Sequence, residues 1–357
     1  MTPVDPDSTS MVTTVWRRLL WSALVLTPVV LVARYGFHLG ATALFVLSAA
    51  ALVPLAWLIG EATEHAAEHT GPGVGGFLNA SFGNAPELII AVIAVTDGLT
   101  GVVRGTITGS VVSNILLVLG AAMIFGGEGA VDARSLRWQL MGVGGGVASF
   151  LAISIPGWHG SPNRHDLMLA SVPIAVALLA AYGWVTVRNL RIHRGAERAE
   201  PSEHAWSLPL ALGVLTAATL ATAFVSEILV HSLHSFGRAV GLGEFFIAVV
   251  IVALVGNAAE HGGAVVVASR GNTQLATEIA ITSSMQVALL VAPAVSLLSL
   301  VLAHRLTLVF RPVEIVTMAL AAALAWLVTR DGRSRRWEGF LLTGAYAVAV
   351  VLYVLFP

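Results

Sequence analysis

The chain has 357 residues, of which 57% are hydrophobic and only 11% are charged. This composition is too apolar for an ordinary soluble domain and is typical of a polytopic membrane protein. A net charge of −1 gives no bulk attraction to nucleic acid, and the absence of cysteine excludes disulfides and thiolate metal sites.

A spanning helix needs about 20 mostly apolar residues. The polar, proline-containing residues 1–14 are expected to be disordered, and the rest of the chain offers eleven segments that meet this measure. The segments lie near 15–34, 40–62, 74–97, 100–125, 136–156, 167–188, 207–232, 241–268, 273–302, 312–329 and 338–356. We therefore predict an all-α polytopic membrane protein with about eleven transmembrane helices, in contact with the lipid bilayer.

One polar motif occurs twice inside these apolar segments. Residues 83–87, Gly-Asn-Ala-Pro-Glu, return as residues 256–260, Gly-Asn-Ala-Ala-Glu, at an offset of 257 − 84 = 173 positions. The same offset aligns Gly98 with Gly271 and Ser110 with Ser283. It advances the chain by five predicted spans, an odd number, so the two copies should enter the membrane from opposite sides.

This pattern predicts two inverted-topology five-helix repeats plus an extra N-terminal helix. The extra helix covers 15–37, repeat 1 covers 38–188, and repeat 2 covers 207–357. Residues 189–206 form the longest polar break and are expected to be a cytoplasmic linker between the repeats. The sequence is compatible with a homo-oligomer but does not fix the number of copies.

The distribution of arginine predicts the orientation, because cytoplasmic segments are enriched in basic residues. A cytoplasmic N-terminus and an external C-terminus assign thirteen arginines to inner segments and five to outer ones. The inner set is Arg17, Arg18, Arg134, Arg137, Arg188, Arg191, Arg194, Arg198, Arg270, Arg330, Arg333, Arg335 and Arg336. The outer set is Arg34, Arg164, Arg238, Arg305 and Arg311, with Arg104 set aside at the start of the fourth span. A bacterial cell membrane is the expected location.

The paired acids predict a cation site at bilayer depth, where an ionisable residue is costly and usually functional. Helix positions three apart share a face, so Asn84 projects with Glu87, and Asn257 projects with Glu260. Carboxylate and amide oxygens suit a hard cation such as Ca2+. Gly83 and Gly256 allow close backbone approach, and Pro86 is expected to kink its helix and to free a carbonyl.

Hydroxyl and amide side chains in the spans that follow each motif are expected to line the site or the path. The 173-residue offset matches two pairs of them, Ser110 with Ser283 and Ser113 with Gln286. These residues are Ser110, Ser113, Asn114, Ser283, Ser284 and Gln286.

A second polar cluster lies at the predicted end of the second span, where a proton relay or a cation entry is expected. Its members are Glu61, Glu64, His65, Glu68 and His69. Glu227 and His231 fall roughly where the inverted copy would place a counterpart, and His261, directly after the second motif, joins this group. A solvated helix end is the alternative interpretation of the cluster.

The two motifs resemble the paired signatures of Ca2+/H+ antiporters, the CAX family of the cation/Ca2+ exchanger superfamily. Residues 68–71 and 78–82 also resemble that family, as do Ser110, Ser113 and Asn114 and their partners Ser283, Ser284 and Gln286. The likeness covers spans two to four and seven to nine. It implies eleven spans, two inverted repeats, and exchange of cytosolic Ca2+ for protons at a central site.

By motif position, the resemblance implies that Glu87 and Glu260 bind Ca2+ and protons, with Asn84 and Asn257 beside them and Asn79 along the path. No cofactor is implied, since Ca2+ is the cargo. The linker departs from the family, because Arg191, Arg194 and Arg198 stand among its acids, where some members carry an acidic helix.

Other functions remain open on the sequence. A related antiporter could exchange Na+ for Ca2+, or Na+ or K+ for protons, although sodium-coupled relatives tend to have Ser or Thr at the positions of Asn84 and Asn257. A membrane metalloenzyme using His65 and His69 lacks an evident third ligand. A passive channel is disfavoured because inverted repeats predict alternating access.

Overall fold

The computed structural model describes residues 16–162, 164–192 and 205–356, except the side chains of 71–77, 79, 80 and 189–192. The described chain is almost entirely helical. Its first half comprises α2 (Leu26–Tyr35), α3 (Ala41–Phe82), α4 (Ala85–Thr96), α5 (Thr100–Val112), the π-helix η1 (Ser113–Val118), α6 (Leu119–Gly126), β1 (Gly129–Ala130), α7 (Ala133–Gly157) and α8 (His165–Ile192).

The second half follows a similar order. It comprises α9 (Leu208–Val240), α10 (Glu244–Phe246), the π-helix η2 (Ile247–Val252), α11 (Ala253–Gly256), α12 (Ala258–Ser269), α13 (Thr273–Gln286), the π-helix η3 (Val287–Val291), α14 (Ala292–Leu298), the 3-10 helix η4 (Ser299–Val301), α15 (Pro312–Thr329), β2 (Arg333–Ser334) and α16 (Arg336–Leu355).

Nine helices in the described residues are long and apolar enough to cross a membrane, and one bent pair raises the count to ten. The all-α membrane fold is therefore confirmed, whereas the expected count of eleven is not. The bent pair joins Glu244–Gly256 to Ala258–Ser269 at 59° and occupies the predicted span 241–268. The predicted span 74–97 is divided instead, because α3 ends at Phe82 and the apolar helix α4 has only 12 residues.

Two predicted boundaries also move. The second predicted span ends near 62, but the corresponding candidate span continues to Thr70, so the polar residues of 61–69 lie within it. The sixth continues to Ile192 instead of ending at 188. In the first place the added residues include Glu61, Glu64 and Glu68, and glutamate is a good helix former. Residues 1–14 and most of the linker, 193–204, lie outside the described residues.

The 173-residue offset recurs in the secondary structure. It carries α4 (Ala85–Thr96) onto α12 (Ala258–Ser269) at both ends, and it carries the start of α5 onto the start of α13. The π-helices η1 and η3 then follow at corresponding positions. Gly98 and Gly271 end the matched helices with φ of 77° and 83°, a conformation that favours glycine. The two halves therefore share local structure as well as sequence.

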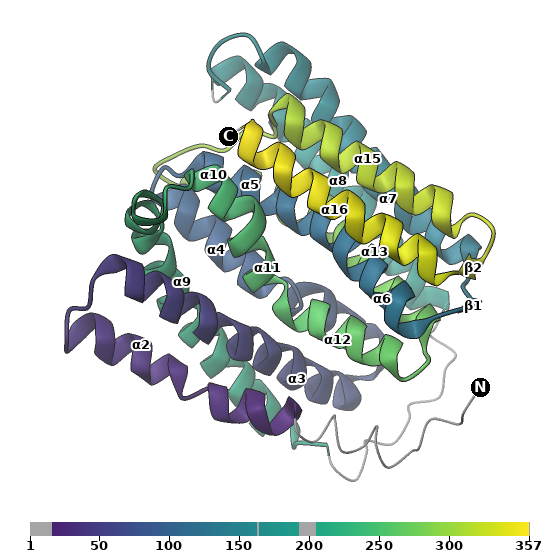
Figure 1. Ribbon diagram of the computed structural model, residues 1–357, viewed down its shortest axis with the longest axis horizontal. Coiled ribbons are helices and arrows are strands. Elements are labelled where there is room, and N and C mark those ends of the chain that lie inside the picture. Colours follow the sequence, from purple (N-terminus) through teal and green to yellow (C-terminus); the bar gives the residue numbers. More distant parts are fainter. Residues whose placement is uncertain (1–15, 163, 193–204, 357) are drawn as a thin grey trace.

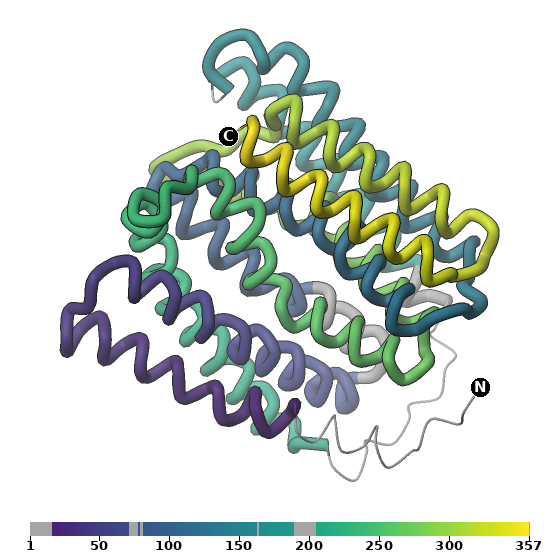
Figure 2. The backbone as a smooth tube through the Cα atoms, viewed as in Figure 1, coloured from purple at the N-terminus to yellow at the C-terminus, as the bar shows by residue number. Residues whose placement is uncertain are grey.

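The helices form two groups around a central layer (Figure 1). In one group α3 packs along α9, and α2 packs on α3. In the other, α15 and α16 lie beside α6, α7 and α8. The short helices α4, α5, α11 and α12 lie between the groups, and the tube in Figure 2 shows how the chain from each half passes through this layer. The central layer is where the two motifs meet.

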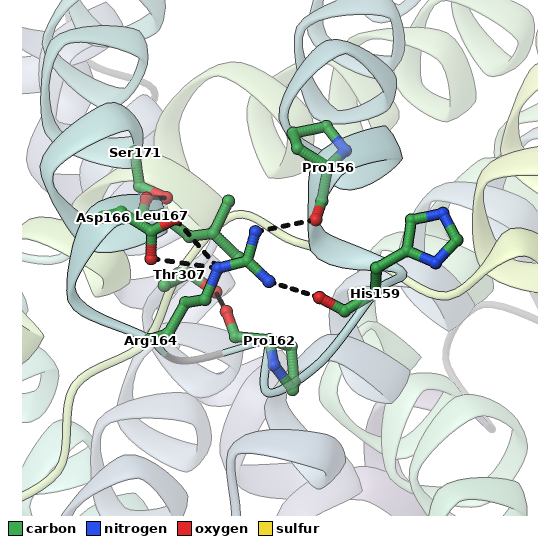
Figure 3. Close-up of polar contacts among 8 residues, drawn as sticks. All are labelled: Pro156, His159, Pro162, Arg164, Asp166, Leu167, Ser171 and Thr307. Carbon is green, nitrogen blue, oxygen red and sulfur yellow. Dashed lines mark hydrogen bonds and ion pairs between the residues drawn. The ribbon is translucent and has the colours of Figure 1, made fainter.

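Short connections hold the helix ends together. At one end β1 pairs antiparallel with β2, with Gly129 opposite Ser334. At the α7–α8 turn the Arg164 guanidinium donates to the Pro156 carbonyl at 2.8 Å, to the His159 carbonyl and to Asp166 (Figure 3). Arg164, counted above only as an outer charge, therefore fixes a turn between two spans.

Candidate functional site

Both motifs interrupt a helix at the asparagine. Asn84 has φ −97° and ψ 15°, and Asn257 has φ −90° and ψ 10°, so the two breaks have the same geometry. The Asn257 side chain donates from Nδ2 to the Ala253 carbonyl at 2.8 Å, and the Asn257 backbone N–H donates to the same carbonyl at 3.3 Å. Each new helix then begins at the residue after the asparagine.

Pro86 does not kink its helix, contrary to the expectation from the sequence. It occupies the first turn of α4, where a backbone N–H is not needed and where proline is well tolerated. The second motif has Ala259 at this position and breaks in the same way. Pro86 therefore does not account for the break, since the second motif breaks without a proline.

Glu87 is enclosed between the halves of the chain. It is 3% exposed and lies in the first turn of α4, where the helix dipole favours a carboxylate. A Cβ added to Gly256 would lie 3.5 Å from Glu87 Cγ, so the glycine backbone of the second motif approaches the acid of the first. Among the described residues, Glu87 Oε2 and Asn84 Oδ1 are buried without a hydrogen-bond partner.

Glu260 is half-buried in the first turn of α12 and accepts a hydrogen bond from Ser283 Oγ on α13. Its charge also interacts with that of Glu87. The two acids of the repeated motif are therefore brought into one electrostatic environment, although they lie far apart in the sequence.

Asn114 and Asn257 connect the halves. Asn114 Nδ2 donates to Asn257 Oδ1 at 3.2 Å and to Ser283 Oγ at 2.8 Å. Asn257 Nδ2 donates to Ser110 Oγ at 2.8 Å, and Asn114 Oδ1 lies 2.8 Å from His261 Nε2. His261 therefore contacts the central network, and its role in proton relay or cation entry stays a prediction. These contacts orient the groups on either side of Glu260.

The equivalent contacts of Asn84 are different. Asn84 Nδ2 donates to Gln286 Oε1 at 2.9 Å, and Gln286 Nε2 lies 3.4 Å from the Tyr182 hydroxyl. Tyr182, in the middle of α8, was not predicted as a site residue because a lone tyrosine in an apolar span carries no distinguishing signal. The two halves are therefore alike in backbone but not in side-chain pairing.

The remaining predicted lining residues make mostly local contacts. Ser113 Oγ lies 3.4 Å from the Ser110 carbonyl, and Ser284 Oγ donates to the carbonyls of Ala280 at 3.1 Å and Val111 at 3.3 Å. Such bonds occupy the hydroxyl hydrogen but leave oxygen lone pairs available. Gly83 lies in the turn before α4. The side chain of Asn79 lies outside the described residues.

The cluster on α3 is linked to the start of α9. His69 Nε2 is 2.6 Å from the Trp206 carbonyl, and the ring of His65 stacks on Trp206 with centroids 4.5 Å apart. His65 lies 3.8 Å from Glu61, which also pairs with Arg17 at 2.6 Å.

The cluster members differ in exposure, and their spacing bears on the metal-site alternative. His65 approaches Glu68 to 3.7 Å, whereas Glu64 is exposed. Within the described part of the chain, no three His, Asp or Glu side chains gather as a metal site.

Glu227 and His231 lie away from the α3 cluster, and their expected role stays a prediction. Glu227 is exposed, and His231 contacts Asp97 at the end of α4 at 3.2 Å. Trp206 touches the α3 cluster just before α9 begins, whereas Glu227 lies 19 residues (227 − 208) beyond Leu208, which is roughly 30 Å along a helix. The offset aligns Glu227 with residue 54, so the expected correspondence was inexact.

A second buried charge cluster was missed. Glu314, 1% exposed, accepts from the Arg311 backbone N–H at 2.6 Å and lies 3.4 Å from Thr108 Oγ1. Arg104, 7% exposed, interacts electrostatically with Glu314 and reaches Thr307 at 3.4 Å. An arginine inside an apolar run is the signal that could have indicated it, because such a charge needs a buried partner.

The site can hold a hard cation. It gathers two carboxylates, amide oxygens and serine hydroxyls from both halves, which are the ligand types that Ca2+ prefers. Both residues of the first motif, Asn84 and Glu87, keep a buried oxygen without a hydrogen-bond partner. This arrangement fits the donor chemistry of a divalent cation.

A family model described as sodium/calcium exchanger protein matches residues 40–191 and 210–355. The two matched stretches nearly coincide with the two repeats expected from the sequence. Together they cover most of the chain.

Individual relatives agree with this match. The chain is 37% identical to the Ca(2+)/H(+) antiporter ChaA of Bacillus subtilis (strain 168), over 89% of this chain and 93% of that protein. It is 33% identical to the Ca(2+)/H(+) antiporter of Aphanothece halophytica, over 95% and 97%. The solved structure of native YfkE superposes with a TM-score of 0.82 at 31% identity, over 94% of this chain and 99% of that one.

Proposed function

This chain belongs to the sodium/calcium exchanger protein family, and from that premise we propose that it exchanges cytosolic Ca2+ for protons by alternating access through Glu87 and Glu260. It is a multi-pass secondary transporter and not an enzyme, and Ca2+ is its transported substrate. The observation that carries the proposal is the pair of matched glutamates, each following a helix break at a buried asparagine and connected across the two halves.

The proposed ligands of Ca2+ are the carboxylates of Glu87 and Glu260 with the amide oxygens beside them. Asn84 Oδ1 and Glu87 Oε2 are buried oxygens that accept no hydrogen bond, so their lone pairs are available to a cation. Two carboxylates balance the charge of one divalent ion, or equally of two protons. The cation and the protons therefore load the same groups.

Competition for these groups provides the coupling. An empty pair of carboxylates in a dehydrated site is penalised by desolvation and by like-charge repulsion. Bound Ca2+ relieves both penalties, and so do bound protons. The carrier then reorients with either load and seldom empty, which is the requirement for obligatory exchange. Because the acids interact, they titrate as a pair and neither has its own simple titration.

The proposed setting is a bacterial cell membrane, with the N-terminus cytoplasmic and the C-terminus external. The thirteen-to-five distribution of arginine supports this orientation. The repeats are then inverted relative to one another, and a homo-oligomer is compatible with the fold. Reporters fused to the two ends, one active only inside the cell and one only outside, test the orientation. Finding both ends on one side would contradict the span count.

The test of function is Ca2+ flux in proteoliposomes that contain the purified chain, with and without an imposed pH gradient. Uptake into acid-loaded vesicles, accompanied by proton efflux, is the expected result. Equal Ca2+ fluxes with and without the gradient would indicate a passive channel. Uptake that requires a sodium gradient would indicate the sodium-coupled alternative.

A further inference from the structure

A groove with a volume of about 440 Å3 runs between α7 and α15. Every side chain that lines it is apolar, and the lining includes Met141, Gly144 and Leu151 on α7 and Ile315, Ala319 and Trp326 on α15. Met141, Leu151 and Trp326 are 53%, 37% and 39% exposed, so the groove faces outward and not into the protein. In Figure 1 the two helices lie side by side in the group remote from α2 and α3. In a membrane protein this surface meets acyl chains.

One end of the groove is basic. Arg137 precedes Met141 by four residues, and Arg330 follows Trp326 by four, so each arginine continues a helix face that lines the groove. Arg137 Nη2 donates to the Arg330 carbonyl at 2.8 Å, which brings the two helix ends together. Arg134 lies one turn before Arg137 and is exposed. Three arginines therefore belong to the helix ends that border this end of the groove.

Among the described residues, Arg134, Arg137 and Arg330 have no carboxylate within ion-pair distance. The neighbouring acids have other partners, because Asp331 pairs with Arg335 at 2.6 Å and Asp132 accepts from the first backbone N–H groups of α7.

A tryptophan lies next to Arg137 at the basic end of the groove. Trp138 is 57% exposed, and the Arg188 guanidinium lies 5.7 Å from its ring centroid. Tryptophan is enriched where hydrocarbon meets water, so this level fits the headgroup region of a bilayer.

We propose that the α7–α15 groove binds an anionic phospholipid, with one acyl chain between the helices and the phosphate at Arg137 and Arg330. Basic pockets between transmembrane helices are suited to anionic headgroups. A zwitterionic lipid has the same kind of acyl chain, but its headgroup also carries a positive group, which the arginines would repel. Because α7 belongs to the first half and α15 to the second, the bound lipid bridges the two halves on their outer surface.

Native mass spectrometry of the full chain in detergent, titrated with phosphatidylglycerol or phosphatidylcholine, tests the proposal. We expect preferential retention of phosphatidylglycerol. The double substitution Arg137→Gln/Arg330→Gln should weaken that binding by at least about tenfold, since each basic residue near an anionic headgroup contributes to attraction. The matched control Arg238→Gln/Arg305→Gln removes the same charge from exposed sites elsewhere and should change binding by less than about twofold.

A second variant tests the groove itself. A Cβ at Gly144 meets nothing within 4 Å, so Gly144→Leu should fold, fill the groove and reduce phosphatidylglycerol binding without any change of charge. Equal affinity for both lipids in the unmodified protein would overturn the proposal. So would unchanged binding in both the arginine and the glycine variants, or an equal loss in the charge control.

A second copy of the chain is the competing occupant. Because the sequence contains no cysteine, Ala319→Cys places a single thiol in the groove. Efficient disulfide cross-linking between copies would show that another protomer covers this surface, and it would overturn the lipid proposal. Absence of cross-linking together with phosphatidylglycerol preference would support it.

Discussion

Asn114 and Asn257 are hydrogen bonded across the two halves of the chain, with Asn114 Nδ2 donating to Asn257 Oδ1 at 3.2 Å. Asn257 is the residue at which the second motif breaks its helix, and Asn114 also contacts Ser283, the hydrogen-bond donor to Glu260. A change at Asn114 should therefore affect the geometry of the ion site without removing either acid.

We expect Asn114→Ala to weaken Ca2+ binding and to lower stability by about 1–3 kcal/mol, because it leaves buried polar partners unsatisfied. Ser113→Ala is the matched control, since its hydroxyl makes one long contact, 3.4 Å, to a local carbonyl. Thermal unfolding and equilibrium Ca2+ binding of both variants check this prediction. Equal behaviour of the two variants would contradict it.

Glu87→Gln and Glu260→Gln should each abolish exchange while leaving the protein folded. The amide keeps the size and one oxygen of the carboxylate but loses its charge and its proton. Glu128→Gln, at an exposed position, serves as the control and should transport normally. Flux in proteoliposomes, with thermal unfolding as the folding test, gives the comparison, and normal flux in either site variant would remove that acid from the site.

Gly109→Ala should destabilise the protein, because α5 and η2 approach closely at this position. The added Cβ would lie 2.0 Å from the Val249 carbonyl oxygen and 2.6 Å from Ala253 Cβ, so the backbones must separate. We expect a loss of about 1–3 kcal/mol, as for other overpacked interiors. Gly101→Ala on the same helix meets nothing within 4 Å and should be neutral or slightly stabilising. Similar melting temperatures for the two variants would refute the close-approach explanation.

His69→Ala should change the rate or the pH dependence of transport but not equilibrium Ca2+ binding. His69 contacts the Trp206 carbonyl at 2.6 Å and so links α3 to the segment before α9, away from the central network. His165→Ala, at an exposed helix start, is the control. A complete loss of Ca2+ binding in His69→Ala would show that this cluster belongs to the central site.

The sequence alone allowed prediction of the helical membrane fold and of the paired motifs. Long apolar segments and a repeated polar motif are both visible directly in the order of the residues. It did not locate the helix breaks correctly. Pro86 led to the prediction of a kink, but the helices are interrupted at Asn84 and Asn257, and the second motif has no proline.

Contacts between the halves were the least predictable feature. The pairing of Asn84 with Gln286 departs from the pattern of Asn257, and the meeting of Arg104 with Glu314 depends on packing over a long sequence separation. Neither follows from spacing along one helix. The correspondence expected for Glu227 is inexact, because the 173-residue offset aligns it with residue 54 and not with the cluster at 61–69.

The most direct test of proton–Ca2+ exchange at Glu87 and Glu260 is equilibrium Ca2+ affinity measured across pH in K+ medium, then repeated with Na+ in place of K+. Ca2+ binds deprotonated carboxylates, so binding releases protons and affinity should fall as pH falls. Replacing K+ with Na+ should leave the affinity unchanged. Ca2+ affinity that is independent of pH but falls when Na+ is added would contradict the account and favour sodium-coupled exchange.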